Sequence, residues 1–571
     1  MLSLVILPPL LVFIYPLALD IPLLDPDEGI FAAISRAMCE SGDWVTPRFL
    51  GEPFFSKPIL YFWSQALSLR LFGIHEAALR LPPLLFGLFG VITTGAVAWR
   101  MFGRKTGILA ALFYTTTALP IALSQSPAHD VTLIPWINLA ILGFWESERA
   151  ATRARAWGCI LAVGVALGVA CLAKGGLGLS TVGATWGAYL LVTRRLTLAA
   201  CLRGLAALTV AALIAAPWFL AMAARNPGYF HYYFVERHLM GYATNTQPHS
   251  GRPFWYYLPI VLAGGLPWII YIPAALHDAW QRRKQCPRGR GDGVATLMIC
   301  WILGCTLFLS LAHSKLVTYI WPVFPPLAIL SATVWTRFFD DSLAPAWRRA
   351  LALAFRVWSW IALLALPLSL AIVHVVYRLP IAPLEWIAAL AVAAVAAVPL
   401  GFWKTGRTNQ ALLTSILSLS VQFAAFMTIV GPGLSPQFSA RDLAAHFNAQ
   451  GRVPPRVLLV EQRVASIAFY LDSRLRAELR PGQLEGFRLA RLEELPTVEP
   501  GTVVAVPQRW LEQTGRCVNL SGIAYQPVGH YRLYEAAPLA QAFMATVKGN
   551  TLLAARPAGA QQRDLKTTVA R

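Results

Sequence analysis

The sequence predicts a polytopic α-helical membrane protein, and three features carry that prediction. Of its 571 residues, 57% are hydrophobic and only 13% are charged. A soluble globular protein has about a quarter of its residues charged, and the mean hydropathy of +0.55 is correspondingly high. Apolar runs of about 18 to 22 residues recur along the chain, and a helix of that length crosses a bilayer.

These runs predict about 13 transmembrane helices. The first covers residues 1–19. No basic segment precedes it and no small-residue cleavage site follows it, so we interpret it as a membrane helix and not as a cleavable signal peptide. The other predicted helices are at residues 81–99, 107–123, 131–146, 157–173, 177–193, 204–222, 256–276, 294–312, 317–335, 351–377, 383–402 and 411–430.

The net charge of +20 is distributed as in a membrane protein, so no nucleic-acid partner is expected. Most lysines and arginines fall in short connections between apolar runs, which is typical of cytoplasmic loops. The alternation of these connections agrees with the predicted number of crossings. The basic connections are near residues 100–105, 149–155, 194–203, 282–290, 337–349 and 404–407.

A change in composition near residue 431 indicates two domains. Residues 1–430 are predicted to form the transmembrane domain, with a first outer loop at 20–80 and a second at 223–255. Residues 431–555 are predicted to form a small α/β domain on the outer side, and 556–571 a disordered tail. In the α/β domain we expect strands at 456–461, 502–506 and 530–535, and a helix at 439–448.

The first outer loop holds a group of carboxylates just after the first apolar run. We expect Asp25, which precedes Pro26, to act as a helix N-cap. Asp27 is the candidate catalytic residue, because a carboxylate at the membrane face can accept a proton from an acceptor hydroxyl or orient that hydroxyl. Glu28 is expected to support Asp27 or to ligate a metal. Helical spacing further predicts that residues 28–38 and 59–72 form helices in the membrane interface.

Basic residues on the same side are candidates for binding a phosphate. Lys57 either snorkels toward lipid headgroups or neutralises a departing phosphate. Lys174, beside two glycines, and Lys315, in an outer turn, each have an anion-binding interpretation. Asp130 follows a turn and is either an N-cap or a polar residue of the site.

The second outer loop is the other candidate region. Glu236, His238 and His249 are possible metal ligands, although their spacing is not a ligand signature, so a divalent metal is only an open alternative. Arg252 in the same loop is a further candidate for contact with the donor phosphate.

Several motifs, taken in order and with compatible spacing, resemble the bacterial aminoarabinose transferase family. They are Leu24–Glu28, Ser41–Pro47, Lys57–Pro58, Tyr61–Trp63, Leu79–Pro82, Ala173–Gly175, Pro253–Pro259 and Ser314–Pro322. That family modifies lipid A, is related to the protein O-mannosyltransferases and has the GT-C membrane glycosyltransferase fold. The motifs cover residues 1–340, and the rest of the chain is similar in layout only.

The resemblance implies an inverting transfer of a sugar from a polyprenyl (undecaprenyl) phosphate to a lipid, lipid A-like or other cell-envelope glycan acceptor. By position, Asp27 matches the family's essential aspartate and Lys57 its donor-phosphate lysine. Lys315 falls at the same anion site, and His249 near the metal-binding histidine. The implied location is the bacterial inner membrane, with membrane lipids around the bundle and with the active site and C-terminal domain in the periplasm.

The chain departs from the family pattern at three places. Ile30 and Phe31 replace an arginine and a tyrosine, which removes one phosphate contact. Ser56 replaces a glutamate that is an expected metal ligand, and one additional residue separates His249 from Pro253. The departures predict a divergent relative with a different sugar, acceptor or both.

Two other functions are compatible with the sequence. A non-catalytic transporter or flippase of lipid-linked sugars typically shows inverted repeats and helices broken within the membrane, and the sequence shows neither. A transferase with another acceptor, either a protein O-glycosyltransferase or a polymerase or ligase of surface polysaccharide, is the other; a polymerase or ligase would use the same carrier, so only its acceptor distinguishes it.

Overall fold

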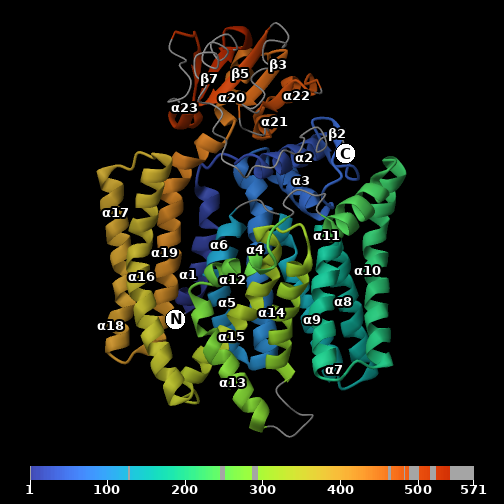
Figure 1. Cartoon of the computed structure of the whole chain (residues 1–571), viewed down its shortest axis with the longest axis vertical. Coiled ribbons are helices and arrows are strands. Elements are labelled where there is room, and N and C mark those ends of the chain that lie inside the picture. The colour runs from blue at the N-terminus through green and yellow to red at the C-terminus, as the bar shows by residue number, and fades with distance from the viewer. Residues whose placement is uncertain are drawn as a thin grey trace. The chain divides into compact units, whose positions relative to one another are not determined.

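The computed structural model describes residues 2–125, 129–244, 251–285, 293–460, 465–480, 482–487, 501–514 and 522–539 (Figure 1). The chain folds into two compact units. The first consists of Met1–Asp20, Asp43–Pro47 and Phe54–Gly431, and the second of Ile21–Gly42, Arg48–Pro53 and Pro432–Arg571. The second unit thus includes part of the first outer loop as well as the C-terminal region.

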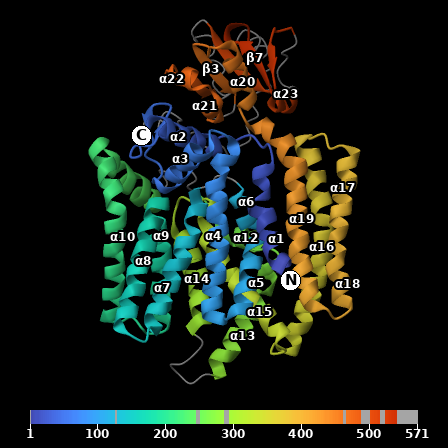
Figure 2. The ribbon, with the colours of Figure 1, turned by 180° about the vertical axis from the view of Figure 1, so that it is seen from behind.

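The first unit is a bundle of helices, as the apolar runs predict. Among the residues that the structure describes, eight spans are long and apolar enough to cross a membrane. They are α4 (Glu76–Phe102), α8 (Arg153–Lys174), α10 (Leu198–Arg225), α14 (Gly293–Leu311), η6 with α15 (Val317–Phe339), α16 (Pro345–Tyr377), α17 with α18 (Pro383–Lys404) and α19 with η8 (Thr408–Phe438). In Figure 1 and Figure 2, α16, α17 and α19 lie at one side of the bundle, and α8 and α10 at the other.

Two predicted spans are bent rather than continuous, which differs from the expectation of unbroken helices. Helices α5 (Arg104–Thr115) and α6 (Ala118–Ser124) meet at an angle of 60°. In the second bent span, the segment Phe254–Gly264, which contains η4 and α12, meets the segment Trp268–Arg282 at an angle of 98°. The latter segment contains η5 and most of α13 (Ile272–Gln285). A backbone hydrogen bond joins the two bends. The amide of Ala118 donates to the carbonyl of Leu266 at 2.9 Å, so backbone groups released by the bends find partners within the bundle.

The three remaining predicted ranges contain shorter helices: α1 (Leu2–Phe13), α7 (Ile134–Arg149) and α9 (Gly176–Val192). Every predicted range therefore contains a helix. By length and composition, however, the described residues have 8 membrane-spanning helices, or up to 10 if each bent pair is one span. The expectation of about 13 is higher because α1, α7 and α9 fall below the length of a full span.

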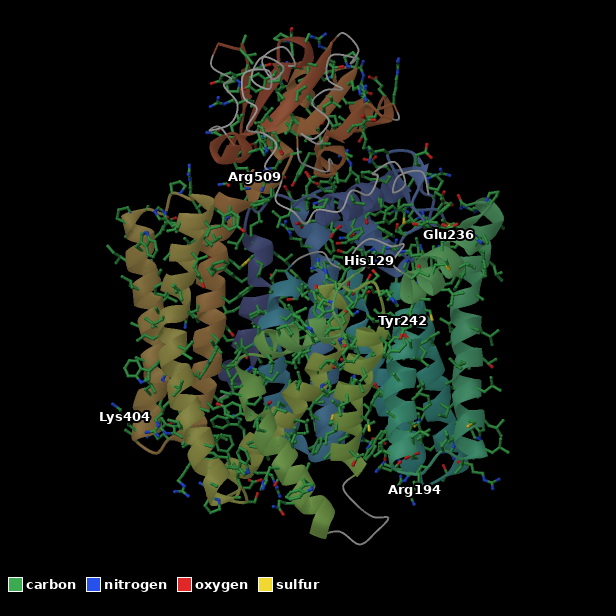
Figure 3. The ribbon with its side chains drawn as sticks, viewed as in Figure 1. His129, Arg194, Glu236, Tyr242, Lys404 and Arg509 are labelled. Carbon is green, nitrogen blue, oxygen red and sulfur yellow. The ribbon has the colours of Figure 1, made fainter. Side chains whose placement is uncertain are left out.

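The basic connections share one end of the bundle, as their alternation predicts. Ion pairs join the connections to one another: Arg100–Glu146 (2.9 Å), Lys105–Asp340 (2.9 Å) and Arg195–Glu148 (3.1 Å). Such exposed pairs contribute little stability, but they show which loops are neighbours. Figure 3 shows Arg194 and Lys404 toward that end, and His129 and Glu236 toward the opposite end.

Small residues allow α8 and α10 to pack closely, which fixes the end of α8 that carries Lys174. A Cβ added at Gly164 would lie 2.4 Å from the Cβ of Val210, and one added at Gly168 would lie 2.6 Å from the Cβ of Ile214. This spacing of four residues is typical of closely packed membrane helices.

The second unit is built on a five-stranded sheet of order β4-β3-β5-β7-β6. The strands are β3 (Arg456–Val460), β4 (Leu484–Phe487), β5 (Thr502–Pro507), β6 (Gln526–Val528) and β7 (Tyr531–Glu535). Strands β3, β4 and β5 are parallel, and β5–β7 and β6–β7 are antiparallel. Three strands occur where the sequence predicts them. Strands β4 and β6 are not predicted, since they are short and contain Gly486 and Pro527, which weaken strand patterns.

Helices and a hairpin complete the second unit. The helices are α2 (Asp27–Ser41), α20 (Arg441–Gln450), α21 (Ser466–Tyr470), α22 (Ser473–Ala477) and α23 (Gln508–Thr514). The hairpin pairs β1 (Arg48–Phe49) with β2 (Glu52–Pro53). Helix α2 and, in the first unit, α3 (Leu60–Phe72) confirm the two helices predicted in the first outer loop. The predicted tail at 556–571 lies outside the described residues.

Candidate functional site

A buried ion pair stands at the outer end of α8. Lys174 is the last residue of the helix, and its ammonium pairs with Asp130 in the 3-10 helix η2 (His129–Thr132). The side chains of Lys174 and Asp130 are only 7% and 9% exposed. Removing one partner of such a pair leaves a buried charge and typically costs about 3–5 kcal/mol.

The residue after Lys174 must be a glycine. Gly175 has a φ of 62°, and a Cβ there would lie 2.4 Å from the Tyr233 hydroxyl and 3.0 Å from Nε2 of His238. Both the backbone conformation and the close approach exclude a side chain. Gly175 therefore lets the π-helix η3 (His231–Met240) lie directly against the end of α8.

Tyr319 forms another side of the same site. The Lys174 ammonium lies 4.5 Å from the centroid of the Tyr319 ring, which is within range of a cation–π interaction. Tyr319 lies in the 3-10 helix η6 (Val317–Val323). The aromatic face can stabilise the lysine charge while leaving its N–H groups able to donate.

Two more cations act on this pair. The charges of both Lys57 and Arg237 act on Lys174, and that of Arg237 also acts on Tyr319. We call Lys57, Lys174 and Arg237, together with Asp130 and Tyr319, the cationic cluster. Because like charges brought together repel one another, such a group favours binding of an anion that brings more than one negative charge.

Two histidines beside the cluster are held neutral. Burial lowers the pKa of His129 well below its usual value, and the charges of Lys57 and Lys174 lower it further. Burial also lowers the pKa of His238; a hydrogen bond to the Tyr233 carbonyl opposes this effect, and Arg237 and Lys57 add to it. Neither imidazole is therefore a cation near neutral pH.

Aromatic rings hold the segment that carries Lys57. Phe55 contacts Tyr229 at a centroid distance of 5.3 Å and Tyr232 at 6.0 Å. Tyr61, four residues after Lys57, contacts the His129 ring in a tilted arrangement at a centroid distance of 4.2 Å. These contacts fix the chain on both sides of Lys57, whose own side chain is partly buried.

Lys315 and Arg252, which are also predicted to bind the donor phosphate, are in contact with each other. The buried Lys315 ammonium donates to the backbone carbonyl of Arg252 at 3.3 Å, and burial lowers the pKa of Lys315. The exposed Arg252 guanidinium lies 5.5 Å from the ring centroid of Tyr256. Their contact with a phosphate stays a prediction.

A metal site is not assembled by the described residues. Glu236 pairs with Nδ1 of His231 at 3.3 Å, and both side chains are largely exposed. The candidate ligand His249 lies outside the residues that the structure describes. Within those residues no group of three histidines, cysteines or carboxylates is placed to hold a metal ion.

The candidate catalytic carboxylate belongs to the second unit. Asp27 is exposed in the first turn of α2, where the helix dipole stabilises a negative charge. Glu28 is buried, and its Oε2 accepts a hydrogen bond from the amide of Leu24 at 2.8 Å. Glu28 thus holds the turn that precedes α2, which suits the supporting role predicted for it.

The N-cap role expected of Asp25 is wrong. Pro26 occupies the N-cap position of α2 and no side chain caps it. Both Asp25 oxygens instead accept hydrogen bonds from Ser466 of α21. The predicted convergence of Asp27 and Lys57 on one phosphate stays a prediction, since they belong to different units.

Arg237 and Tyr319 were not among the predicted site residues. In the second outer loop the sequence instead indicates the neighbouring Glu236 as a candidate. Tyr319 lies four residues after Lys315, in a run that becomes helical, so helical spacing was the available signal for it. Because Tyr319 lies far from Lys174 in the sequence, residue spacing could not indicate the contact between these two side chains.

Comparisons with known proteins agree with the sequence motifs. The family model of dolichyl-phosphate-mannose-protein mannosyltransferase matches residues 26–233. The chain is 36% identical over 335 residues to the undecaprenyl phosphate-alpha-4-amino-4-deoxy-L-arabinose arabinosyl transferase of Aeromonas hydrophila, covering 57% of this chain and 58% of that one. It is 35% identical over 359 residues to the Aeromonas salmonicida enzyme of the same name, covering 62% of each. The chain thus spans less than two thirds of either relative.

Solved structures establish the fold over a longer range. The crystal structure of ArnT from Cupriavidus metallidurans bound to undecaprenyl phosphate matches with a TM-score of 0.72 at 24% identity, covering 94% of this chain and 97% of that chain. The archaeal oligosaccharyltransferase AglB from Archaeoglobus fulgidus matches with a TM-score of 0.51 at 12% identity, covering 94% and 74%. The chain is therefore a multi-pass membrane protein with the GT-C fold, and its resemblance to the aminoarabinose transferases and protein mannosyltransferases is confirmed.

Proposed function

We propose that the chain is an inverting glycosyltransferase that moves a sugar from a polyprenyl (undecaprenyl) phosphate to a lipid A-like or other cell-envelope acceptor. The observation that carries the proposal is the cationic cluster, in which the buried Lys174 pairs with Asp130 and the charges of Lys57 and Arg237 act on Lys174. The names of the relatives and the lipid in the ArnT structure support the choice of donor.

The donor phosphate binds at the cluster. Lys57 and Arg237 contribute charge and hydrogen bonds, while Asp130 and Tyr319 hold Lys174. Hydrogen bonds to charged groups are each worth about 1.5–3 kcal/mol. A phosphate here brings negative charge to a site where the positive charges of Lys57 and Arg237 act on Lys174, so binding also offsets that repulsion.

The reaction is a single displacement at the anomeric carbon. An acceptor oxygen forms a bond to that carbon on the face opposite the phosphate, and the bond from the carbon to the phosphate oxygen breaks. The leaving group departs as polyprenyl phosphate, whose added negative charge the cluster stabilises. A hydroxyl acceptor gives its proton to Asp27, whereas an ionised phosphate acceptor carries no such proton and Asp27 orients it.

The positions of the basic loops predict the orientation of the bundle in the membrane. The basic connections share the end of the bundle that carries Arg194 and Lys404 (Figure 3), and basic loops face the cytoplasm. We infer that the opposite end, with His129 and Glu236, faces the periplasm across a bacterial inner membrane.

Mass spectrometry of cell-envelope lipids and glycans tests the proposal. Cells with an active copy should contain a glycosyl mass, on a lipid or glycan, that is absent from cells without the gene. Identical profiles under expression of the folded protein would refute the transferase. Accumulation or relocation of the lipid-linked sugar without a new glycoconjugate would instead indicate a transporter.

One observation favours a second acceptor class. The family model matching residues 26–233 is that of a protein mannosyltransferase. A glycosyl mass on a secreted protein, with the lipids unchanged, would assign the chain as a protein O-glycosyltransferase that uses the same donor site.

A further inference from the structure

Helix α2, which carries Asp27, packs on the backbone of α21 through a glycine. A Cβ added at Gly29 would lie 2.3 Å from the backbone nitrogen of Ser466 and 2.8 Å from its Cα. Contacts this short with backbone atoms cannot be relieved by moving a side chain. Gly29 is thus required for α2 to lie where it does on α21, even though glycine weakens a helix by about 1 kcal/mol.

Hydrogen bonds fix the N-terminal end of α2 at the same place. The backbone amide of Ser466 donates to Oδ1 of Asp25 at 2.7 Å, and its hydroxyl donates to Oδ2 at 2.6 Å. The Ser466 hydroxyl also accepts from the amide of Ala440 at 2.9 Å. One serine therefore joins the turn before Asp27 to two parts of the C-terminal chain.

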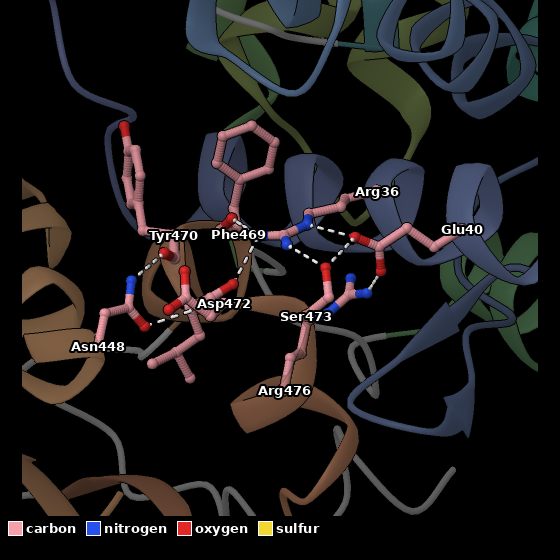
Figure 4. Close-up of polar contacts among 9 residues, drawn as sticks. Arg36, Glu40, Asn448, Phe469, Tyr470, Asp472, Ser473 and Arg476 are labelled. Atoms are coloured by element: carbon pink, nitrogen blue, oxygen red, sulfur yellow. Dashed lines mark hydrogen bonds and ion pairs between the residues drawn. The ribbon is translucent and has the colours of Figure 1, made fainter. Parts of the chain in front are cut away.

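A second set of contacts fixes α2 near its other end (Figure 4). Nη1 of Arg36 donates to the carbonyl of Leu471 at 2.7 Å and also to the carbonyl of Phe469, and Nη2 donates to the Ser473 hydroxyl at 3.0 Å. Arg36 is only 6% exposed. A buried guanidinium bound to backbone carbonyls admits few alternative geometries.

Glu40 extends this second set by one turn. Its carboxylate accepts from Nε of Arg36 at 2.8 Å and from Ser473 at 3.1 Å, and it forms an ion pair with Arg476 of α22 (Figure 4). At about 1.5 Å per residue, Asp27 at the start of α2 and Arg36 lie roughly 14 Å apart along the helix axis. Two anchors at that separation determine both the direction and the rotation of the helix.

We propose that residues 466–476 of the C-terminal chain, here called the docking segment, position Asp27 for the reaction, and that Ser466 and Arg36 are positioning residues. The proposal rests on the proposed function, in which Asp27 acts on the acceptor. The C-terminal domain then contributes to catalysis without touching the substrate: it holds the helix that presents the carboxylate.

The sharpest test is Gly29→Ala, because alanine favours the helix itself, while its Cβ would clash with the Asp25 carboxyl group and with the Ser466 backbone that this carboxyl group binds. The matched control is Gly204→Ala in α10, where an added Cβ meets nothing within 4 Å. Each variant is purified in lipid nanodiscs. The readouts are kcat and KM for the donor, binding of undecaprenyl phosphate, and hydrogen exchange in α2 and the docking segment.

Gly29→Ala should raise hydrogen exchange in the docking segment and lower kcat by at least tenfold, since a misplacement of about 1 Å can cost about 10²-fold. The donor KM and undecaprenyl phosphate binding should stay within about twofold, because Lys57 and Lys174 lie in the other unit. An unchanged kcat despite faster exchange would overturn the positioning role. So would an equal loss of kcat and donor binding, which marks general damage.

Two substitutions of Ser466 distinguish a loss of positioning from a loss of folding. Ser466→Ala removes the hydroxyl that bonds Asp25 and Ala440, whereas Ser466→Thr keeps one. The alanine variant should lose kcat and the threonine variant should recover most of it. Equal activity of the two would contradict the role of Ser466. Absence of transfer by the wild-type chain would overturn the proposed function, and the positioning role with it.

Discussion

At the scale of single residues, the site depends on charges that are costly unless they bind an anion. Lys174 is buried at the end of an apolar helix and has one carboxylate partner, Asp130. The charges of Lys57 and Arg237 oppose its own. A structure that only needed to be stable could replace such a group with apolar side chains at little cost, so the cluster indicates a function.

Replacing Lys57 with glutamine should weaken donor binding while leaving the fold intact. Loss of one charge-assisted hydrogen bond costs about 1.5–3 kcal/mol, which corresponds to a fall in affinity of about 10- to 100-fold. Native mass spectrometry of the protein titrated with undecaprenyl phosphate measures this change. The matched control is Lys404→Gln at the opposite end of the bundle (Figure 3), and equal affinity of the two variants would remove Lys57 from the site.

At the scale of elements, α2 is docked through a carboxyl group that titrates near neutrality. Burial raises the pKa of Asp25 from 3.8 to about 7, although hydrogen bonds from Ser466 act in the opposite direction; the charge of Glu28 adds to the increase. Since the pKa is raised, the docked state favours the protonated acid. The contribution of Asp25 to docking is fully present below its unfolded pKa and is lost as pH rises through about 7.

Hydrogen exchange of α2 should therefore increase between about pH 4 and about pH 7 by more than the intrinsic exchange rate does, and should follow the intrinsic rate at higher pH. In Asp25→Asn the group at this position does not titrate, so that extra increase should disappear. A wild-type profile that follows the intrinsic rate, or protection that improves as pH rises, would contradict the assignment.

Elements with regular hydrophobic patterns could be predicted from the sequence. The bundle helices, α2, α20 and the strands β3, β5 and β7 all occur where periodicity places them. The bends at 115–118 and 264–268 were not predicted, because the threonines at the first break and the glycines and proline at the second also occur within continuous membrane helices. The bends depend on contacts between distant segments, such as that of Ala118 with Leu266.

The site was only partly predictable, for a similar reason. Motifs identified Lys57, Asp130 and Lys174 as separate candidates, but a local pattern does not pair side chains from different helices. The partner of Asp25 is 441 residues away in the sequence, so spacing could suggest only the local N-cap role, which was wrong.

At the scale of the whole molecule, we propose different roles for the two units. The first contains the cationic cluster proposed to bind the donor phosphate, and the second contains Asp27, on a helix bonded to the C-terminal chain. Because binding and proton transfer belong to different units in this proposal, substitutions should separate them cleanly.

Transfer by Asp27→Asn tests this account most directly, with the donor and acceptor that the lipid and glycan profiles identify. The variant should bind undecaprenyl phosphate as the wild-type chain does. Its kcat should fall by about 10²- to 10⁴-fold with a hydroxyl acceptor, the range expected for loss of a general base. Full activity in a folded, membrane-inserted Asp27→Asn protein would contradict the central claim.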